Sequence, residues 1–158
     1  VGRRARDFGM LAAGLCVIDF SDKGNLDRYL TAGLAAPEGD SAWTSQSDVL
    51  LQFKPQRADR DIELHISAAP FLPRNRIAIQ PTELRFNGVL LFSAPFTEIG
   101  VLRVRIPHEL WNKYPIASLH LYFPNAKAPW QVGVSGDVRI LALSLNRLTT
   151  KLSDTPRP

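Results

Sequence analysis

The residue type that most directly indicates a binding interaction in this sequence is a tryptophan in a polar loop. The stretch PEGDSAWTSQSD places Trp43 among small polar residues. The flat apolar ring suits the CH-bearing face of a sugar, and Asp40, Ser41 and Ser45 can hydrogen-bond sugar hydroxyls. The alternative is that Trp43 folds inward as a lid on the core. We predict that Trp43, Asp40 and Ser45 contribute to a carbohydrate-binding site.

Two histidines extend this candidate set. His65 and His120 fall on the polar faces of predicted strands, and Tyr122 shares its face with His120. If the two strands are neighbours, the histidines meet. No HxH or HExxH motif and no third ligand accompany them, so we predict solvated polar faces and sugar contacts rather than a metal site. No cofactor is predicted, and a structural calcium ion in a loop stays open as an alternative.

Catalytic motifs are missing from the sequence. There is no GxSxG motif, and the one cysteine, Cys16, has no signalled histidine partner. Asp59, Asp61 and Glu63 lie along one strand entry, whereas a glycosidase needs two carboxylates on facing strands. We predict a protein without catalytic residues, and keep a small glycan hydrolase or lyase as a third hypothesis.

The charge balance is basic without a basic stripe. The 158 residues have a net charge of +4 and a pI near 9.6, and Lys and Arg are scattered. No aromatic pair of the type that stacks on bases accompanies them. Nucleic acid is therefore not a predicted partner.

The other two tryptophans are predicted to be structural. Trp111 lies in HELWNKY, where it anchors a helical turn that begins at Pro107. Trp130 follows Pro129 and precedes a long apolar run. We expect its ring to cap the core, and an exposed ring is the alternative.

The elements that position these residues are short strands. Apolar and polar residues alternate in DIELHISAA, VLRVRIP and SLHLYFP, which is typical of half-buried antiparallel strands. Asn87-Gly88 predicts a two-residue hairpin turn, and a change of phase predicts a β-bulge near Ile140. The pattern predicts an all-β fold, an antiparallel β-sandwich of jelly-roll type with one or two short helical turns.

We expect one domain over residues 13–152. Residues 1–12 are predicted to be a flexible lead-in or linker and residues 153–158 a disordered tail. The apolar run from Phe8 to Ile18 is too short to span a bilayer, and CVIDFS is the expected entry strand.

Two stretches carry a resemblance to a known domain. The matching positions of the first are Gly33, Pro37, Glu38, Gly39 and Trp43. Those of the second are Phe123, Asn125, Ala126, Pro129, Gly133, Ser135, Asp137, Arg139, Leu141 and Leu145. Over roughly residues 15 to 150 the chain resembles a jelly-roll domain at the C-terminal end of bacterial membrane-bound sugar and phosphoglycerol transferases. Leu34 departs from the pattern, which has an aromatic residue there. Asp137 and Arg139 share a strand face, and we predict a structural ion pair.

The resemblance implies a non-catalytic accessory domain, similar to carbohydrate-binding modules, in bacterial cell-surface polysaccharide or glycan assembly. It implies a glycan or polysaccharide partner, a membrane-bound transferase domain or subunit beside it, and a place on the extracytoplasmic or periplasmic side of the cell envelope. The second hypothesis is a structural, docking or oligomerisation module without sugar binding. An exposed apolar patch on one sheet face would favour it.

Overall fold

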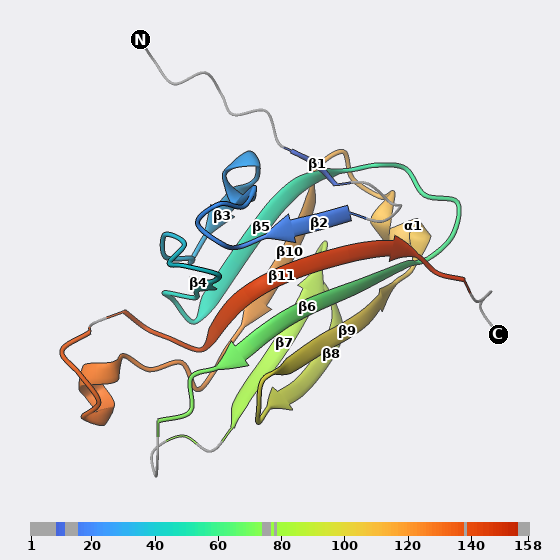
Figure 1. Cartoon of the computed structure of the whole chain (residues 1–158). Helices are drawn as coiled ribbons and strands as arrows, with labels where there is room; N and C mark the ends of the chain where they lie inside the picture. The colour runs from blue at the N-terminus through green and yellow to red at the C-terminus, as the bar shows by residue number, and fades with distance from the viewer. Residues whose placement is uncertain (1–8, 12–15, 74–76, 78, 138, 155–158) are drawn as a thin grey trace.

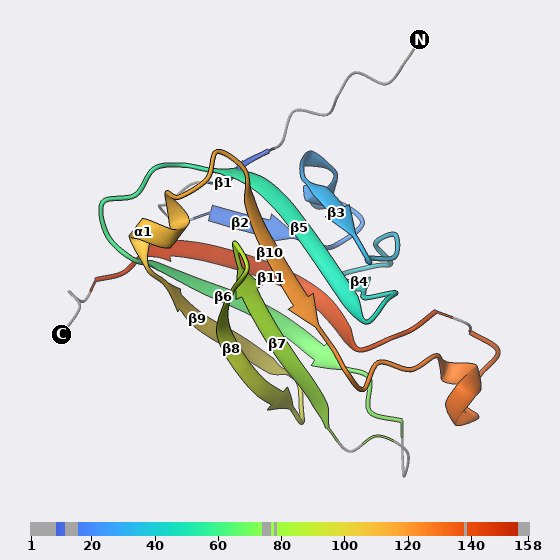
Figure 2. The same ribbon diagram turned by 180° about the vertical axis from the view of Figure 1, so that it is seen from behind.

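The computed structural model describes residues 9–11, 16–73, 77, 79–137 and 139–154. Two β-sheets pack face to face, and the few helical turns lie at their ends (Figures 1 and 2). This arrangement confirms the predicted antiparallel sandwich. None of the helices in the described part is long and apolar enough to cross a membrane.

The larger sheet has six strands. Its order is β1 (Met10–Leu11), β5 (Asp48–Pro55), β10 (Ala117–Tyr122), β7 (Gln80–Phe86) and β8 (Val89–Phe96), with β3 (Leu30–Ala32) also on β5. Only β1 pairs in parallel. The predicted turn joins β7 to β8, with positive φ at Asn87 and Gly88 (50° and 84°). Those angles are what a two-residue hairpin turn of type I′ requires.

The smaller sheet has five strands. Its order is β2 (Cys16–Asp19), β11 (Leu143–Leu152), β6 (Ile62–Pro70) and β9 (Gly100–Ile106), with β4 (Ala42–Trp43) also on β11. All its pairs are antiparallel. β2 is the predicted entry strand.

The described part of the chain also has three short helical segments: η1 (Leu26–Arg28), α1 (His108–Trp111) and η2 (Pro129–Val132). α1 is the predicted turn, and Pro107 precedes it. Trp111 is fully buried, as predicted for an anchor. Its ring stacks on Phe86, with centroids 5.6 Å and planes 6° apart, and lies tilted against Phe53, also with centroids 5.6 Å apart. Its indole Nε1 donates to the Gln56 carbonyl at 2.7 Å.

The β-bulge lies elsewhere than predicted. The register of β11 against β6 shifts between Leu145 and Arg147, not near Ile140. Ile140 precedes the strand, and its backbone N–H donates to the Ser45 carbonyl. Val138, which the prediction also used, lies outside the described residues. The apolar pattern recorded a phase change but could not place the extra residue, because that depends on pairing with β6.

The ends of the sandwich extend slightly past the predicted boundaries. Met10 and Leu11, expected in the lead-in, form β1 against Lys54 and Pro55, and Leu11 is fully buried. Ser153, expected in the tail, is buried, and its N–H donates to the Asp61 carbonyl at 2.8 Å.

Gly33 is a position where only glycine fits. Its φ is +82°, and a Cβ built there would clash with the backbone oxygen of Asp48. Gly33→Ala is therefore expected to lower the free energy of unfolding by about 1–2 kcal/mol, measured by urea denaturation. Gly39→Ala is the matched control, because Gly39 has φ +61° but open space around it. Equal losses in the two variants would contradict the clash.

Candidate functional site

The structure divides the predicted sugar-binding residues among three places. Trp43, Asp40 and Ser45 lie together where β4 meets β11. His65 lies on β6 in the five-stranded sheet, whereas His120 and Tyr122 lie on β10 in the six-stranded sheet. The two histidines therefore do not meet, because their strands belong to different sheets.

The 37–45 loop is held against β11 by short contacts. Ala42 is buried and faces the core, so Trp43 faces outward. The Trp43 ring is half-buried and meets Phe71 edge-on, with centroids 6.3 Å apart. It is thus neither the inward-facing lid of the alternative interpretation nor a freely exposed platform. The backbone of Ser45 is hydrogen-bonded to Gly33 and Ile140, whereas the side chain of Asp40 is exposed.

His120 and Tyr122 face outward from the middle of the six-stranded sheet. His120 Nε2 lies 2.8 Å from Asp48 Oδ1 across the β5–β10 pair. Tyr122 stands directly opposite Asp48 and, on its other side, opposite Glu83. This surface offers hydrogen-bonding groups beside one half-buried tyrosine.

Trp130 corrects our expectation that it caps the core. The residue is 56% exposed, the most exposed of the three tryptophans in the structure. It lies on η2, within the segment 124–142 that links β10 to β11, and we call this segment the arm. In both views η2, drawn in orange, stands away from the two sheets (Figures 1 and 2).

The arm is fixed by its own hydrogen bonds. The Trp130 N–H donates to the Asp137 carbonyl at 3.1 Å. Gln131 Oε1 accepts from the Ala128 N–H at 3.0 Å. Gly133 ends η2 with φ +73°, a conformation that favours glycine. The exposed ring therefore stands on a shaped turn.

Arg139 clamps the arm to the 37–45 loop. The predicted ion pair with Asp137 is confirmed, but both residues precede β11 and do not share a strand face as predicted. Arg139 Nη2 lies 2.7 Å from Asp137 Oδ2, and its Nε also donates to that carboxylate. Its Nη1 donates to Glu38 Oε1 at 3.0 Å, across 101 residues of chain. Hydrogen bonds from Arg139 lower the pKa of Asp137, and the same pairing raises the pKa of Arg139.

The clamp has a pH dependence whose sign follows from the lowered pKa of Asp137. A carboxyl group with a depressed folded-state pKa stabilises the fold above its ordinary pKa of about 3.9, and that contribution is lost as the pH falls through the folded-state value. We expect the NMR signal of the Trp130 indole to stay constant from pH 7 to about pH 4 and to shift below it. Asp137→Asn should abolish this acid transition. A transition that persists in the variant would contradict the clamp.

A cleft of about 370 Å³ opens beside the same loop. One wall comes from the η1 segment, with Asp22 and Asp27, and the other from residues 34–37, including Leu34. The Asp22 N–H donates to the Gly39 carbonyl at 2.9 Å, which joins the wall to the loop. We call the cleft, the 37–45 loop and the arm together the loop end.

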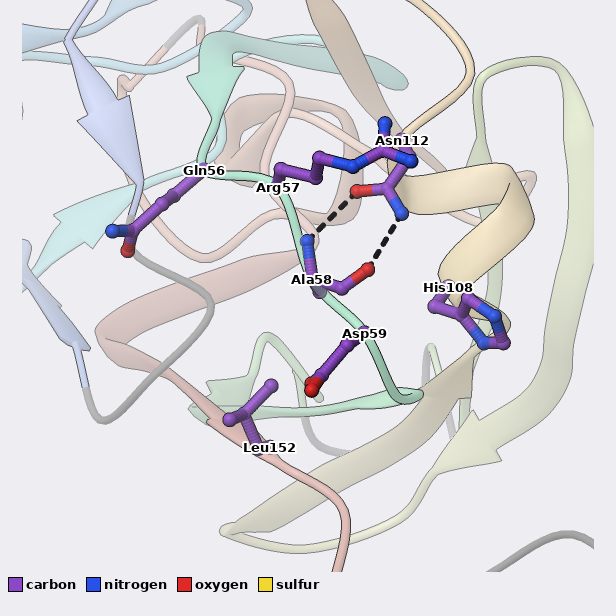
Figure 3. Close-up of a pocket in the computed structure, with 7 residues that line it drawn as sticks. All are labelled: Gln56, Arg57, Ala58, Asp59, His108, Asn112 and Leu152. Carbon is purple, nitrogen blue, oxygen red and sulfur yellow. Dashed lines mark hydrogen bonds between the residues drawn. The ribbon is translucent and has the colours of Figure 1, made fainter.

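A cavity of about 630 Å³ lies at the α1 end of the sandwich. Figure 3 shows its lining from the 56–59 segment, α1 and Leu152, with Asn112 bonded to both backbone groups of Ala58 (2.9 and 2.7 Å). His108 lines it and binds Asp61 Oδ1 at 3.0 Å. The second oxygen of this buried carboxylate accepts from Arg105 at 2.9 Å.

The group of Asp61, His108 and Glu109 has the residue types of a metal site. Both oxygens of Asp61 are, however, already engaged by Arg105 and by the backbone and ring of His108. These bonds hold α1 against the start of β6. The cluster therefore has a structural role. Because both oxygens of Asp61 are hydrogen-bonded, this carboxylate is poorly placed for acid–base chemistry.

Sequence reasoning gave an exposed Trp130 only as the less favoured alternative. The only signal was local: PNAKAPWQVGVSGD does not alternate, and a tryptophan between a proline and two glycines is better suited to a turn than to a core.

Comparison of the sequence with family models and with curated proteins finds no match. Solved structures do share the fold. A family 6 carbohydrate-binding module, described in a study of its binding subsites, is 9% identical with a TM-score of 0.52, and the match covers 92% of this chain and 98% of that one. A Podospora anserina GH26-CBM35 β-(1,4)-mannanase is 12% identical with a TM-score of 0.50; the match covers 92% of this chain and 29% of that one.

The mosquito-larvicidal Cry4Aa toxin of Bacillus thuringiensis is also similar, at 9% identity and a TM-score of 0.55. There the match covers 94% of this chain and 25% of the toxin. The chain thus has the jelly-roll sandwich fold found in carbohydrate-binding modules. Because the toxin shares that fold, function has to be argued from the surface residues.

Proposed function

We propose that this domain is a non-catalytic carbohydrate-binding module whose sugar site is the loop end. The observation that carries the proposal is the exposed ring of Trp130. Its turn is held by the hydrogen bond from the Trp130 N–H to the Asp137 carbonyl and by the ion pair of Asp137 with Arg139. An exposed aromatic ring on a hydrogen-bonded turn presents a flat apolar face on which a sugar ring can stack. A flat ring that is already positioned loses little freedom when a sugar stacks on it.

The surroundings of the arm supply polar partners. Glu38 reaches the arm through Arg139 and is next in sequence to Pro37, which lines the cleft. Asp22 and Asp27 in the cleft and Asp40 in the loop are exposed carboxylates. Carboxylates accept hydrogen bonds from sugar hydroxyls, so the loop end combines an apolar ring with hydrogen-bonding groups, as ligand sites commonly do.

The alternative of a docking module has less support. Its expected mark is a continuous apolar patch on one sheet face. The exposed apolar residues near β8 instead divide between its two ends, with Val89 and Leu90 at the start and Ile99 and Val101 beyond the finish. The hydrolase hypothesis also has less support, because both carboxylate oxygens of Asp61 are already bonded to Arg105 and His108.

The biological setting is a further part of the proposal. On the resemblance of residues 15 to 150 to the transferase-associated jelly-roll domain, we place the module beside a membrane-bound sugar or phosphoglycerol transferase, on the extracytoplasmic side of a bacterial envelope. There it would hold a glycan or polysaccharide near the enzyme that assembles it.

The test is a glycan array probed with the wild-type domain and with Trp130→Ala. Binding to a defined set of glycans that is lost in Trp130→Ala supports the proposal. Tyr114→Ala is the matched control, because Tyr114 is a similarly exposed aromatic residue (46%) in the loop after α1. A wild-type domain that binds no glycan would contradict the proposed function, and Trp43→Ala in the same series measures how far the 37–45 loop contributes.

A further inference from the structure

A second surface of the molecule gathers cations that the loop end does not use. It is the outer face of the five-stranded sheet, across β11, β6 and β9, and we call it the basic face. Its outward residues are Arg147, Thr149 and Lys151, then Glu63, His65 and Ser67, then Val101, Arg103 and Arg105. We propose that the basic face binds an anionic polysaccharide through carboxylate or sulfate groups on its sugars. The ligand class rests on the proposed function.

The β-bulge creates half of this surface. In β11, Leu143 and Leu145 face the core, and uninterrupted alternation would turn Arg147 inward as well. The extra residue resets the phase between Leu145 and Arg147. Leu148 is therefore buried, and Arg147 points to solvent.

Register sets the cationic residues in rows. Thr149, His65 and Arg103 stand opposite one another across three strands, and Lys151, Glu63 and Arg105 form the next row. Neighbouring strands are about 4.8 Å apart, and alternate residues along a strand are about 7 Å apart. The face is thus a grid of mainly cationic and hydroxyl side chains on rigid strands, with the Glu63 carboxylate among them.

Of the four Lys and Arg side chains on the grid, two form ion pairs with described residues and two do not. Arg105 is paired with Asp61 at 2.9 Å, and Lys151 with Glu63 at 3.4 Å. Arg147 stands opposite Asp19, whose pKa is lowered mainly by hydrogen bonds from Ser21 and in smaller part by the charge of Arg147. The side chain of Arg103 is exposed and makes no ion pair or hydrogen bond with the described residues.

Arg103 also borders a hollow. A depression of about 210 Å³ is lined by Glu63, His65, Arg103, Val104 and Arg105. An anionic oxygen there can accept from the fork of Arg103 and from the ring of His65, its neighbour across the β6–β9 pair. An unpaired guanidinium beside a hollow is suited to a carboxylate or a sulfate ester.

The same face offers a contact for a sugar ring. Trp43 stands opposite Ser144 on β11, and Ser144 stands opposite Ala69 on β6, so all three side chains share the outer side. Small side chains there let the half-buried Trp43 ring border the grid. This apolar end favours a polysaccharide over a polyanion without sugar rings.

The test compares polymers and charge-matched variants. Affinity electrophoresis would use polygalacturonate (carboxylate), dextran sulfate (sulfate ester), neutral dextran, polyglutamate and duplex DNA, at 20 and 300 mM NaCl. We expect tighter binding to one or both anionic polysaccharides than to neutral dextran, and weakening by salt. Arg103→Gln should reduce that affinity about fivefold at low salt. Arg57→Gln is the control, since it removes the same charge from an exposed residue at the α1 end.

The outcomes separate the two proposals. Loss with Arg103→Gln and retention with Arg57→Gln and with Trp130→Ala supports the basic face, and the preferred polymer identifies the anionic group. Equal loss in Arg57→Gln would overturn the assigned surface. Polyglutamate or DNA bound as tightly as the anionic polysaccharides would overturn the ligand class. If the glycan array shows no binding but an anionic polysaccharide binds in an Arg103-dependent way, the loop-end proposal alone is refuted. If no anionic polymer binds, the basic-face proposal alone is refuted.

Discussion

Trp130→Ala is expected to weaken glycan binding roughly thirtyfold, a loss of about 2 kcal/mol, as for a tryptophan at the centre of a binding surface. The ring is 56% exposed, so its removal leaves little cavity and should change the melting temperature only slightly. The measurement is isothermal titration calorimetry with the best ligand from the array. Tyr114→Ala should bind like the wild-type domain.

The clamp sharpens this test. Asp137→Asn leaves the ring in place but removes the charge that holds Arg139. We expect a smaller loss of affinity than for Trp130→Ala. The ring is still present in Asp137→Asn, but it is more mobile in the free protein and loses conformational entropy when the sugar binds. An affinity for Trp130→Ala within twofold of the wild type would show that the arm does not bind the glycan. The cleft at Asp22 and Asp27 would then be the remaining candidate at the loop end.

Trp111→Ala is expected to cause a larger change, in stability rather than in binding. The fully buried ring lies against Phe86 and Phe53, and its Nε1 bonds the Gln56 carbonyl. Truncation leaves a cavity and an unpaired carbonyl, so we expect a loss of about 3–5 kcal/mol of unfolding free energy. Chemical denaturation followed by circular dichroism measures it.

A graded series tests the cause of that loss. Trp111→Phe retains an aromatic ring between its neighbours but loses the indole donor, and should cost less than Trp111→Ala. Trp130→Ala is the control for deleting an indole ring outside the core. A Trp111→Ala variant destabilised by less than about 1 kcal/mol would show that the α1 end does not depend on this anchor.

The two proposed surfaces make different demands on the fold. The loop end depends on loops that long-range contacts hold together, such as Arg139 with Glu38. The basic face depends on strands whose inward residues are core, such as Leu64 and Leu148. Substitutions of outward residues on the basic face should therefore leave the core intact.

Local pattern was enough for much of the architecture. Alternation in DIELHISAA and SLHLYFP identified β6 and β10 and their inward faces, because the strand period of two is a property of the backbone. The turn at Asn87-Gly88 followed from the positive φ that these residues accept. The Asp137–Arg139 pair and the anchoring by Trp111 also followed from near neighbours in the chain.

Tertiary structure decided which faces meet and which side chains stay open. Alternation marks the inward side of a strand but not its sheet, so it could not separate His65 from His120. The bulge position depended on pairing β11 with β6, more than seventy residues earlier in the chain. Trp130 is exposed because η2 stands away from the two sheets (Figure 1), and the contact of Arg139 with Glu38 joins the arm to a loop about a hundred residues earlier in the chain. Contacts between distant residues, which no local pattern encodes, therefore set the candidate sites.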